Sequence, residues 1–412
     1  MLAFRSSREF ATVRWSIPGS PPKASRLSSR ARPTRSLPVQ AGTHHRQPSF
    51  RALSVSAMKS AVCAQRLAAA ESLWSITTRL GSFGTSLGLK LQRDGGRLTP
   101  VRIDSATSEW KMPWPTWAAR SDGKVCLAVV LALADEISSY GGMACFDKKR
   151  RPGVTLSISG TLAARSDGEV PSVSGGEELH FVSRKLKTGR QLGHMELEIW
   201  RGAPSSSGEL LAVGRHSKML SLPAPLLSPI SVLESVGASA MFAHVQPWAM
   251  RLFEHRYPDV RPWPPMDPKR RADLFPPLEA IATDAAMSRL MPLRHPAAVE
   301  GTAPILYAAP LSPTWSNLMG NMHGGAACIL GEQIAAASYR HAMGADLGVD
   351  VSPPPRMMHV QMLSGLVCDG RMAQFEAVSS PAPGQDHSSR STLATMRHAT
   401  NAGRAVECTY WW

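Results

Sequence analysis

One stretch decides the fold of this chain: Asn317-Leu-Met-Gly-Asn-Met-His-Gly-Gly-Ala-Ala-Cys-Ile-Leu-Gly-Glu332. It joins a loop that ends in His323-Gly324-Gly325 to the start of an apolar helix with a single acid. The first N–H groups of a helix have no partner within the helix, and the helix dipole makes this end positive. Since glycine has no side chain, a ligand can approach this backbone closely. The stretch is therefore suited to hold an oxyanion that develops during acyl transfer.

This pattern resembles the signature of the hotdog-fold thioesterases of the phenylacetate-pathway and acyl-CoA thioesterase 13 type. That signature is Asn-x-x-Gly-x-x-His-Gly-Gly, followed after six residues by an acid. The chain matches every position, with Glu332 where the family usually has Asp. The simpler alternative is a glycine-rich turn before a core helix, which His323 only caps.

The net charge of +15 is concentrated in residues 1–66, which hold 12 of the 46 basic residues and only one acid, Glu9. The remaining chain is close to neutral, so the sequence predicts no nucleic-acid partner. An Arg- and Ser-rich, acid-poor leader without a long apolar segment is typical of an organellar transit peptide. We expect a disordered targeting segment over 1–66 and a mitochondrial location, with the plastid as the alternative. A basic tail without a targeting role is the other possibility.

No apolar run reaches the ~20 residues that cross a bilayer, so we expect no integral membrane segment. Six cysteines show no Cys-x-x-Cys pair and no histidine at zinc spacing, which favours reduced, mostly buried thiols. The sequence therefore implies no metal and no cofactor.

The same order of elements occurs twice along the chain. In residues 67–225, an apolar helix over 125–139 precedes strand-like runs at 153–159, 178–183, 191–200 and 208–220. In residues 301–412, a strand and the loop with His323 precede an apolar helix over 326–342 and strands near 356–365, 371–380, 390–398 and 403–411. Residues 226–300 are rich in Pro and Trp and read as a linker with a possible helix. The pattern predicts an α+β chain of two tandem hotdog domains, each an antiparallel sheet wrapped around a long central helix.

The first half, residues 67–225, resembles the same family through other residues. Asp135-Glu-Ile-Ser-Ser139 is similar to the end of its central helix, where the acid is Asp. Pro152-Gly-Val-Thr155 is similar to a strand start that has Ser at the position of Thr155. Residues 187–192 and 208–218 are similar to two strands that lie near the coenzyme A moiety in that family. The resemblance thus implies substrate-binding roles for Lys187, Gly189, Arg190, Arg215, Lys218 and, in the second half, Gly325. Ordinary solvated charges at strand ends are the alternative for the basic residues.

The two halves lack complementary parts of the signature. Nine residues before Asp135 stands Cys126, followed by Leu and Ala, where His-Gly-Gly is expected. A gene-model error near residues 120–124 is one explanation for this loss. The second half has Glu332 in place of Asp, and Met358 where Ser or Thr is expected.

Helix geometry shows why one half does not suffice. His323 and Glu332 are nine positions apart, which is about 13.5 Å of rise and about 900° of rotation on one helix, so they face opposite sides. The acid that works with His323 must come from another helix. The family resemblance implies two hotdog units packed as a pseudo-dimer, with sites shared between them.

The resemblance then implies one composite active site. Its expected catalytic residues are Asp135, Thr155, Asn317, His323 and Gly324. The second site, with Glu332 and Met358, is expected to be degenerate. The predicted function is hydrolysis of an acyl-CoA to a free fatty acid and CoA, and such chains can assemble into homo-oligomers. The alternatives are a hotdog dehydratase or hydratase and a non-catalytic acyl-CoA-binding or scaffold protein with decayed sites.

Overall fold

A computed structural model of the chain describes most of the two halves. The described residues are part of 63–74, then 82–89, 97–118, 120, 122–148, 151–164, 168–204, 207–220, 291–293, 305–317, 320–343, 353–381, 390–398 and 403–412. The predicted targeting segment 1–66 lies outside them except for residues 63, 64 and 66. The predicted linker 226–300 and its possible helix also lie outside them, except for the strand β7 at Met291–Leu293.

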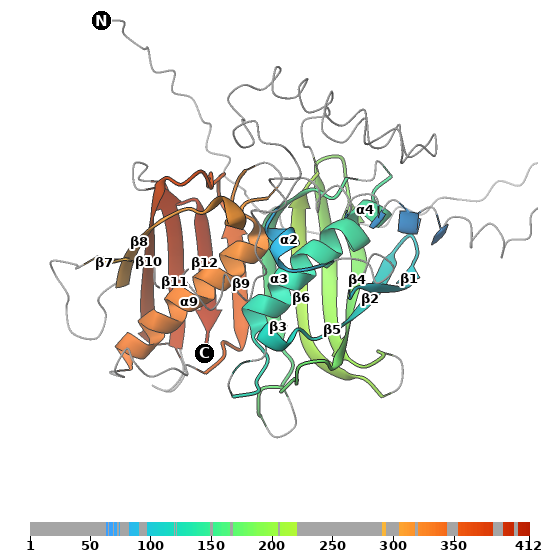
Figure 1. Ribbon diagram of the computed structural model, residues 1–412, viewed down its shortest axis with the longest axis horizontal. Helices are drawn as coiled ribbons and strands as arrows, with labels where there is room; N and C mark the ends of the chain where they lie inside the picture. The colour runs from blue at the N-terminus through green and yellow to red at the C-terminus, as the bar shows by residue number, and fades with distance from the viewer. Residues whose placement is uncertain are drawn as a thin grey trace, which may run out of the picture. The chain divides into compact units, whose positions relative to one another are not determined.

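The first half is built around one long buried helix (Figure 1). Helix α3 covers Leu127–Glu136 and continues without a break through the π-helical segment η3, Ile137–Met143, and the short helix α4, Ala144–Phe146. All ten residues of α3 are buried, and its Leu, Val and Ala side chains make the helix apolar on every face. The helix predicted over 125–139 is confirmed and is longer than expected.

The stretch Leu127–Phe146 is, by length and composition, apolar enough to cross a membrane. No run of that kind was expected from the sequence, because Asp135 and Glu136 interrupt the apolar residues. Inside the protein, 94% of the most apolar window of this stretch is buried. Burial of this extent is what the central helix of a globular domain requires.

Six strands accompany this helix. They are β1 (Thr99–Ile103), β2 (Thr107–Pro113), β3 (Val154–Leu162), β4 (Glu178–Thr188), β5 (Leu192–Arg201) and β6 (Glu209–Met219). Burial alternates along β2 and β5, so that one face of the sheet meets the helix and the other is more exposed. The strand-like runs of the first half are confirmed.

The second half repeats this plan. Its elements are β8 (Ile305–Pro310), the 3-10 turn η5 (Pro313–Trp315), α9 (Gly324–Ala342), β9 (Met357–Met362), β10 (Met372–Pro381), β11 (Arg390–His398) and β12 (Val406–Trp411). The predicted helix and the four predicted strands after it are confirmed. Helix α9 starts two residues earlier than expected, directly after His323.

All twelve strands form one antiparallel sheet in the order β1-β2-β4-β5-β6-β3-β9-β12-β11-β10-β8-β7. In the first half the chain forms β2, the central helix, β3, β4, β5 and β6 in sequence, and these strands lie side by side in the order β2-β4-β5-β6-β3. In the second half the corresponding order is β8-β10-β11-β12-β9. This topology, with a long helix against one face, is that of a hotdog domain, and it occurs twice. Strands β3 and β9 pair with each other and join the two sheets.

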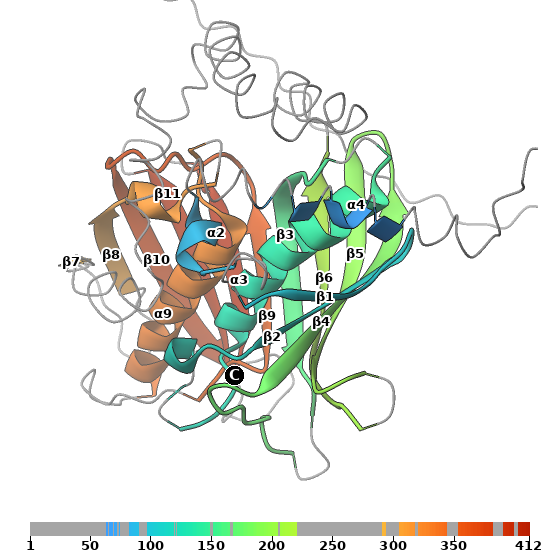
Figure 2. The same cartoon turned by 45° about the vertical axis from the view of Figure 1, so that its right-hand side comes forward.

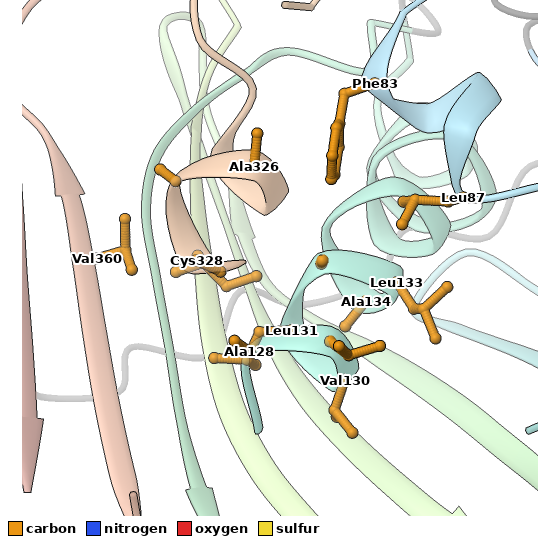
Figure 3. Close-up of a cluster of buried hydrophobic side chains, with 14 of the residues drawn as sticks. Phe83, Leu87, Ala128, Val130, Leu131, Leu133, Ala134, Ala326, Cys328 and Val360 are labelled. Atoms are coloured by element: carbon orange, nitrogen blue, oxygen red, sulfur yellow. The ribbon is translucent and has the colours of Figure 1, made fainter. Parts of the chain in front are cut away.

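The central helices of the two halves pack against each other on the same side of the sheet (Figures 1 and 2). They run antiparallel, because the start of α9 contacts the end of α3, and Glu332 of α9 contacts the start of α3. A Cβ atom added at Gly325 would lie 3.0 Å from the Ala132 Cα, so the two backbones approach closely here. Small residues at this crossing bring Ala128 of α3 and Ala326 and Cys328 of α9 into one core (Figure 3).

Candidate active site

A tight turn sets the start of helix α9. Gly320 has a φ of +75°, a conformation that glycine adopts without strain. The Asn317 N–H donates to the Asn321 carbonyl at 2.7 Å, and the Asn317 Oδ1 accepts from the Asn321 N–H at 3.3 Å. The His323 N–H donates to the Trp315 carbonyl at 2.8 Å. Asn317 thus stabilises the turn that leads into the helix.

The first N–H groups of α9 point to the other half of the chain. The Gly325 N–H donates to Oδ2 of Asp135, on α3, at 2.9 Å. For the Gly324 N–H, the described part of the chain supplies no acceptor. A Cβ at Gly324 would lie 2.7 Å from the Asp135 Oδ2 and 2.8 Å from the Thr155 Cγ2, so only glycine fits here. One donor at the helix start is therefore free to bind an anion.

Asp135 is fully buried and is held by side chains from two strands. Its Oδ1 accepts from the Thr155 hydroxyl at 2.8 Å and lies 3.2 Å from Nε2 of His216 and 3.5 Å from Nζ of Lys218. Lys218 also donates to the hydroxyl of Ser139, one helical turn after Asp135. The carboxylate is thus surrounded by hydrogen-bond donors, which is the environment that a buried charge requires.

The electrostatics of this cluster favour an ionised Asp135. Burial alone raises the pKa of Asp135, but the charges of His323 and Lys218 and the hydrogen bond from His216 bring it well below its ordinary value. Burial and the neighbouring Lys218 lower the pKa of His216 to about 4, so this imidazole is neutral at physiological pH. Burial also lowers the pKa of Lys218, which Asp135 partly offsets. Asp135 therefore keeps its charge at neutral pH.

His323 lies between two carboxylates of α3. Its Nδ1 is 3.3 Å from the Asp135 Oδ2, and its Nε2 is 3.0 Å from the Glu136 Oε1. Burial lowers the pKa of His323, but Asp135 and Glu136 more than offset this effect, so the pKa lies above its ordinary value. The ring also packs against Phe83, with centroids 5.3 Å apart.

The opposite site has the same backbone arrangement and different side chains. Oε2 of Glu332 accepts from the Ala128 N–H at 3.0 Å, just as Asp135 accepts from the Gly325 N–H. The Cys126 thiol stands where the first site has His323, with Sγ 3.7 Å from the Glu332 carboxylate. Burial raises the pKa of Glu332 above its ordinary value.

Even the preceding turn is retained in the first half. Gly123 has a φ of +71°, and its N–H donates to the Arg120 carbonyl at 2.9 Å, as the Gly320 N–H does to the Asn317 carbonyl. Cys126 thus follows a turn with the same glycine conformation and the same closing hydrogen bond as the turn before His323.

The polar side chains around Asp135 have apolar or weakly polar counterparts around Glu332. Met358 is fully buried at the position of Thr155. Strand pairing aligns His216 with Ile158 and Lys218 with Thr155, and in the second half it aligns Cys408 with Val360 and Tyr410 with Met358. The charged neighbour of Glu332 is Arg120, whose Nη1 lies 4.0 Å from the Glu332 Oε1. The site around Asp135 differs from it by the Thr155, His216 and Lys218 side chains that face the carboxylate.

A scan against protein-family models and a search of curated proteins find no match to this chain. Solved structures do resemble its fold. The acyl-CoA thioesterase II TesB2 from Mycobacterium marinum is 10% identical over 80% of this chain and 96% of that chain, with a TM-score of 0.41. The tesB protein from Mycobacterium avium subs paratuberculosis is 10% identical over 76% and 94%, with a TM-score of 0.42. Thioesterase superfamily member 2 from Mus musculus is 22% identical over 32% and 86%, with a TM-score of 0.26. At these identities and scores, no property of those proteins transfers to this chain.

The structure brings most of the expected catalytic residues together. Asp135, Thr155, His323 and Gly324 lie within one cluster, whereas Asn317 forms hydrogen bonds with Asn321 in its own turn. Glu332 and Met358 lie in the opposite site, as expected. Among the described residues, no group of three or more His, Cys, Asp or Glu side chains is arranged to hold a metal.

The expected substrate-binding residues fall into two groups. Lys187, Gly189, Arg190 and Arg215 are exposed on β4, the turn after it and β6. Lys218, expected to contact a substrate phosphate, is instead buried beside Asp135. The reason is the two-residue period of a strand, which directs Lys218 inward and Arg215 outward. Gly325 is committed to Asp135 through its N–H.

Three residues of the cluster were not foreseen: His216, Ser139 and Glu136. Strand alternation carried a signal for His216, because it lies two residues before Lys218 and therefore on the same face. Ser139 lies four residues after Asp135, on the same side of the helix. For Glu136 no such signal exists, since its contacts depend on α9 and on the short helix α2, Phe83–Ser86.

Proposed function

We propose that this protein hydrolyses an acyl thioester, in particular an acyl-CoA, at one composite active site per chain. The observation that carries the proposal is the meeting of the Asp135 carboxylate with the N-terminus of α9, where the Gly324 N–H has no acceptor within the described residues. The acid and the oxyanion donor come from different halves, as the helix geometry demands.

In this mechanism, the carbonyl oxygen of the thioester accepts from the Gly324 N–H. A water oxygen attacks the carbonyl carbon, the negative charge moves to the carbonyl oxygen, and the free N–H stabilises it. The C–S bond then breaks, and the thiolate leaves and takes up a proton. The products are a carboxylic acid and a free thiol.

Asp135 acts on the water or attacks the carbonyl itself. Thr155, whose hydroxyl donates to the Asp135 Oδ1 at 2.8 Å, orients the reacting group. In the first route the carboxylate accepts the proton of the water. In the second, a mixed anhydride forms on Asp135 and water hydrolyses it. A single turnover in ¹⁸O-water detects the second route when water attacks the Asp135 carbonyl of the anhydride, because the first product then carries an oxygen of the enzyme.

Asn317 and His323 support the site. Asn317 holds the turn before α9, and His323 fixes the helix start against Asp135 and Glu136. Both His323 ring nitrogens face carboxylates, which argues against a role as the main base. The exposed side chains of Lys187, Arg190 and Arg215 are candidate contacts for the phosphates of coenzyme A. The basic, acid-poor segment 1–66 supports action in a mitochondrion or a plastid.

A panel of acyl-CoA thioesters tests the proposal. We expect the wild-type chain to release CoA, and Asp135→Asn to lower kcat/KM by about 10³-fold, the range of a lost acid–base group. Glu332→Gln, the matched change in the opposite site, should alter kcat/KM little. Binding without turnover across the panel would instead favour an acyl-CoA-binding or scaffold protein. Inactivation by Glu332→Gln with an active Asp135→Asn would place the chemistry at the other site.

A further inference from the structure

Glu136 is a second buried acid beside the candidate site. Its exposed fraction is 1%, and its Oε1 lies 3.0 Å from the His323 Nε2. Within the described part of the chain, neither carboxylate oxygen has a hydrogen-bond partner, and the His323 Nε2 lies within ion-pair distance of the Oε1. A buried acid with one such neighbour is costly unless that neighbour carries the opposite charge.

The surroundings seal this pair from water. Helix α2 lies over Glu136, and a Cβ added at Gly84 would lie only 2.0 Å from the Glu136 Oε1. Phe83 of the same helix packs against the His323 ring (Figure 3 shows Phe83 above the start of α9). The attraction between Glu136 and His323 is therefore stronger here than at a surface.

The opposite site provides an internal comparison. By the spacing of the two helices, Gln333 follows Glu332 as Glu136 follows Asp135, and Cys126 occupies the place of His323. The half-site with the histidine has an acid at this position, and the half-site with the cysteine has a neutral amide. The acid thus occurs only where there is an imidazole for it to face.

We propose that Glu136 is a positioning residue for the thioester hydrolysis proposed above, on which this inference rests. It holds His323 doubly protonated, with the ring fixed between two carboxylates at the N-terminus of α9. Nε2 then forms an ion pair with the Glu136 Oε1 at 3.0 Å, and Nδ1 lies 3.3 Å from the Asp135 Oδ2. In the structure the Gly325 N–H donates both to the Asp135 Oδ2 at 2.9 Å and to the His323 Nδ1 at 3.0 Å, and protonation of Nδ1 would leave only the bond to Asp135.

The imidazolium adds a positive charge next to the N–H that receives the oxyanion. The charged and titratable groups that face it are Asp135 and Glu136 from α3 and, from β6, Lys218 and the neutral His216. Helix α2, with the sequence Phe-Gly-Thr-Ser, contributes none. The two acids thus lie opposite two basic side chains, His323 and Lys218.

The pH dependence of kcat/KM tests this role. His323 loses its proton as the pH rises through its raised pKa, so we expect an alkaline limb in the wild type. Glu136→Gln should move that limb to lower pH by about one unit or more, because a nearby opposite charge is worth 1–3 units. Glu136→Asp, which keeps the carboxylate, should bring the alkaline limb most of the way back to its wild-type pH. Gln333→Glu, the same change in the opposite site, should leave the limb in place.

A second readout does not depend on activity. In histidine-labelled protein, with His323 assigned through a His323→Gln variant, NMR should give a wild-type His323 pKa above that of an ordinary histidine. A wild-type value at or below the ordinary one overturns the proposal, whether or not the Glu136 variants fold. The proposal is also overturned if the Glu136→Gln variant folds and its alkaline limb stays at the wild-type pH. If no acyl-CoA is hydrolysed but NMR shows that Glu136→Gln lowers the His323 pKa, the proposed function fails and the contact between Glu136 and His323 stands.

Discussion

Asp135 keeps a negative charge in a place without solvent because four groups from three elements face it. Thr155 and His216 come from strands β3 and β6, Lys218 from β6, and the Gly325 N–H from α9. Each element alone would leave the carboxylate underpaired. The negative charge on Asp135 therefore depends on both halves being assembled. The residues that contact the carboxylate should then affect how the stability of the protein depends on pH.

His216 should make the protein sensitive to acid. It is neutral when buried, with a pKa of about 4, whereas an unfolded histidine titrates near 6.5. As the pH falls from about 6.5 to about 4, the unfolded chain binds a proton first, so the free energy of unfolding decreases. This loss is on the order of 3 kcal/mol. Urea denaturation at several pH values should show a flatter dependence in His216→Asn. The exposed His341→Asn is the control, and an equally flat profile there would contradict the assignment.

Asn317 should act through its turn. Asn317→Ala removes the side-chain oxygen that accepts from the Asn321 N–H, at a typical cost of about 1 kcal/mol. Because this turn positions the Gly324 N–H, we expect kcat to fall while the KM changes less. Steady-state kinetics on an acyl-CoA substrate provide the measurement. A variant that folds normally and keeps full kcat would show that the turn needs no such support.

At the scale of elements, the close crossing of α3 and α9 positions the site. A Cβ at Gly325 would lie 3.0–3.2 Å from three atoms of Ala132, two of them backbone atoms. These atoms must give way for any larger residue. The crossing thus depends on the small residues along both helices.

Gly325→Ala should separate the helices and move the Gly325 N–H from Asp135. We expect a loss of about 1–3 kcal/mol of stability, as for other overpacked sites, and a loss of activity in the remaining folded protein. Gly331→Ala is the matched control, because its Cβ would meet the Tyr410 hydroxyl and the Cys408 sulfur in the opposite site. It should destabilise the chain without lowering kcat per folded molecule. Equal kinetic effects of the two changes would contradict a single active site.

Much of this element plan could be predicted from the sequence. Both central helices and the strands that follow each of them are where apolar runs and alternation indicate them, because local patterning fixes these elements. The spacing of His323 and Glu332 indicated that an acid near His323 comes from another helix, and Asp135 of α3 lies 3.3 Å from His323. The contact of Lys218 with Asp135 and that of Glu136 with His323 could not be predicted in this way, since they arise from packing between distant segments. The pairing of β3 with β9 has no local signal either.

At the scale of the whole molecule, the β3–β9 pairing makes one sheet of two. Ile158 pairs with Val360 across this junction, and both side chains are completely buried. Figure 3 shows Val360 at the edge of the core that α3 and α9 share. The two halves are therefore expected to unfold together.

Val360→Ala tests this cooperativity. Removing buried methyl groups should cost about 2 kcal/mol. If the halves unfold as one, hydrogen exchange should speed up equally in the β4–β5 region of the first half and the β10–β11 region of the second. Mass spectrometry of peptides from the two regions gives the comparison. Faster exchange confined to the second half would indicate two independent folding units.

The retained turns at Gly123 and Gly320 have a consequence for how such a chain can change over time. In a dimer of identical subunits, every substitution enters both sites at once, so losing the histidine would remove it everywhere. Two copies on one polypeptide are free to diverge. One copy can give up its histidine and the other its hydroxyl-bearing strand residue while a complete set survives between them. The backbone around Glu332 still has to persist, because it is half of the scaffold on which the site around Asp135 is assembled.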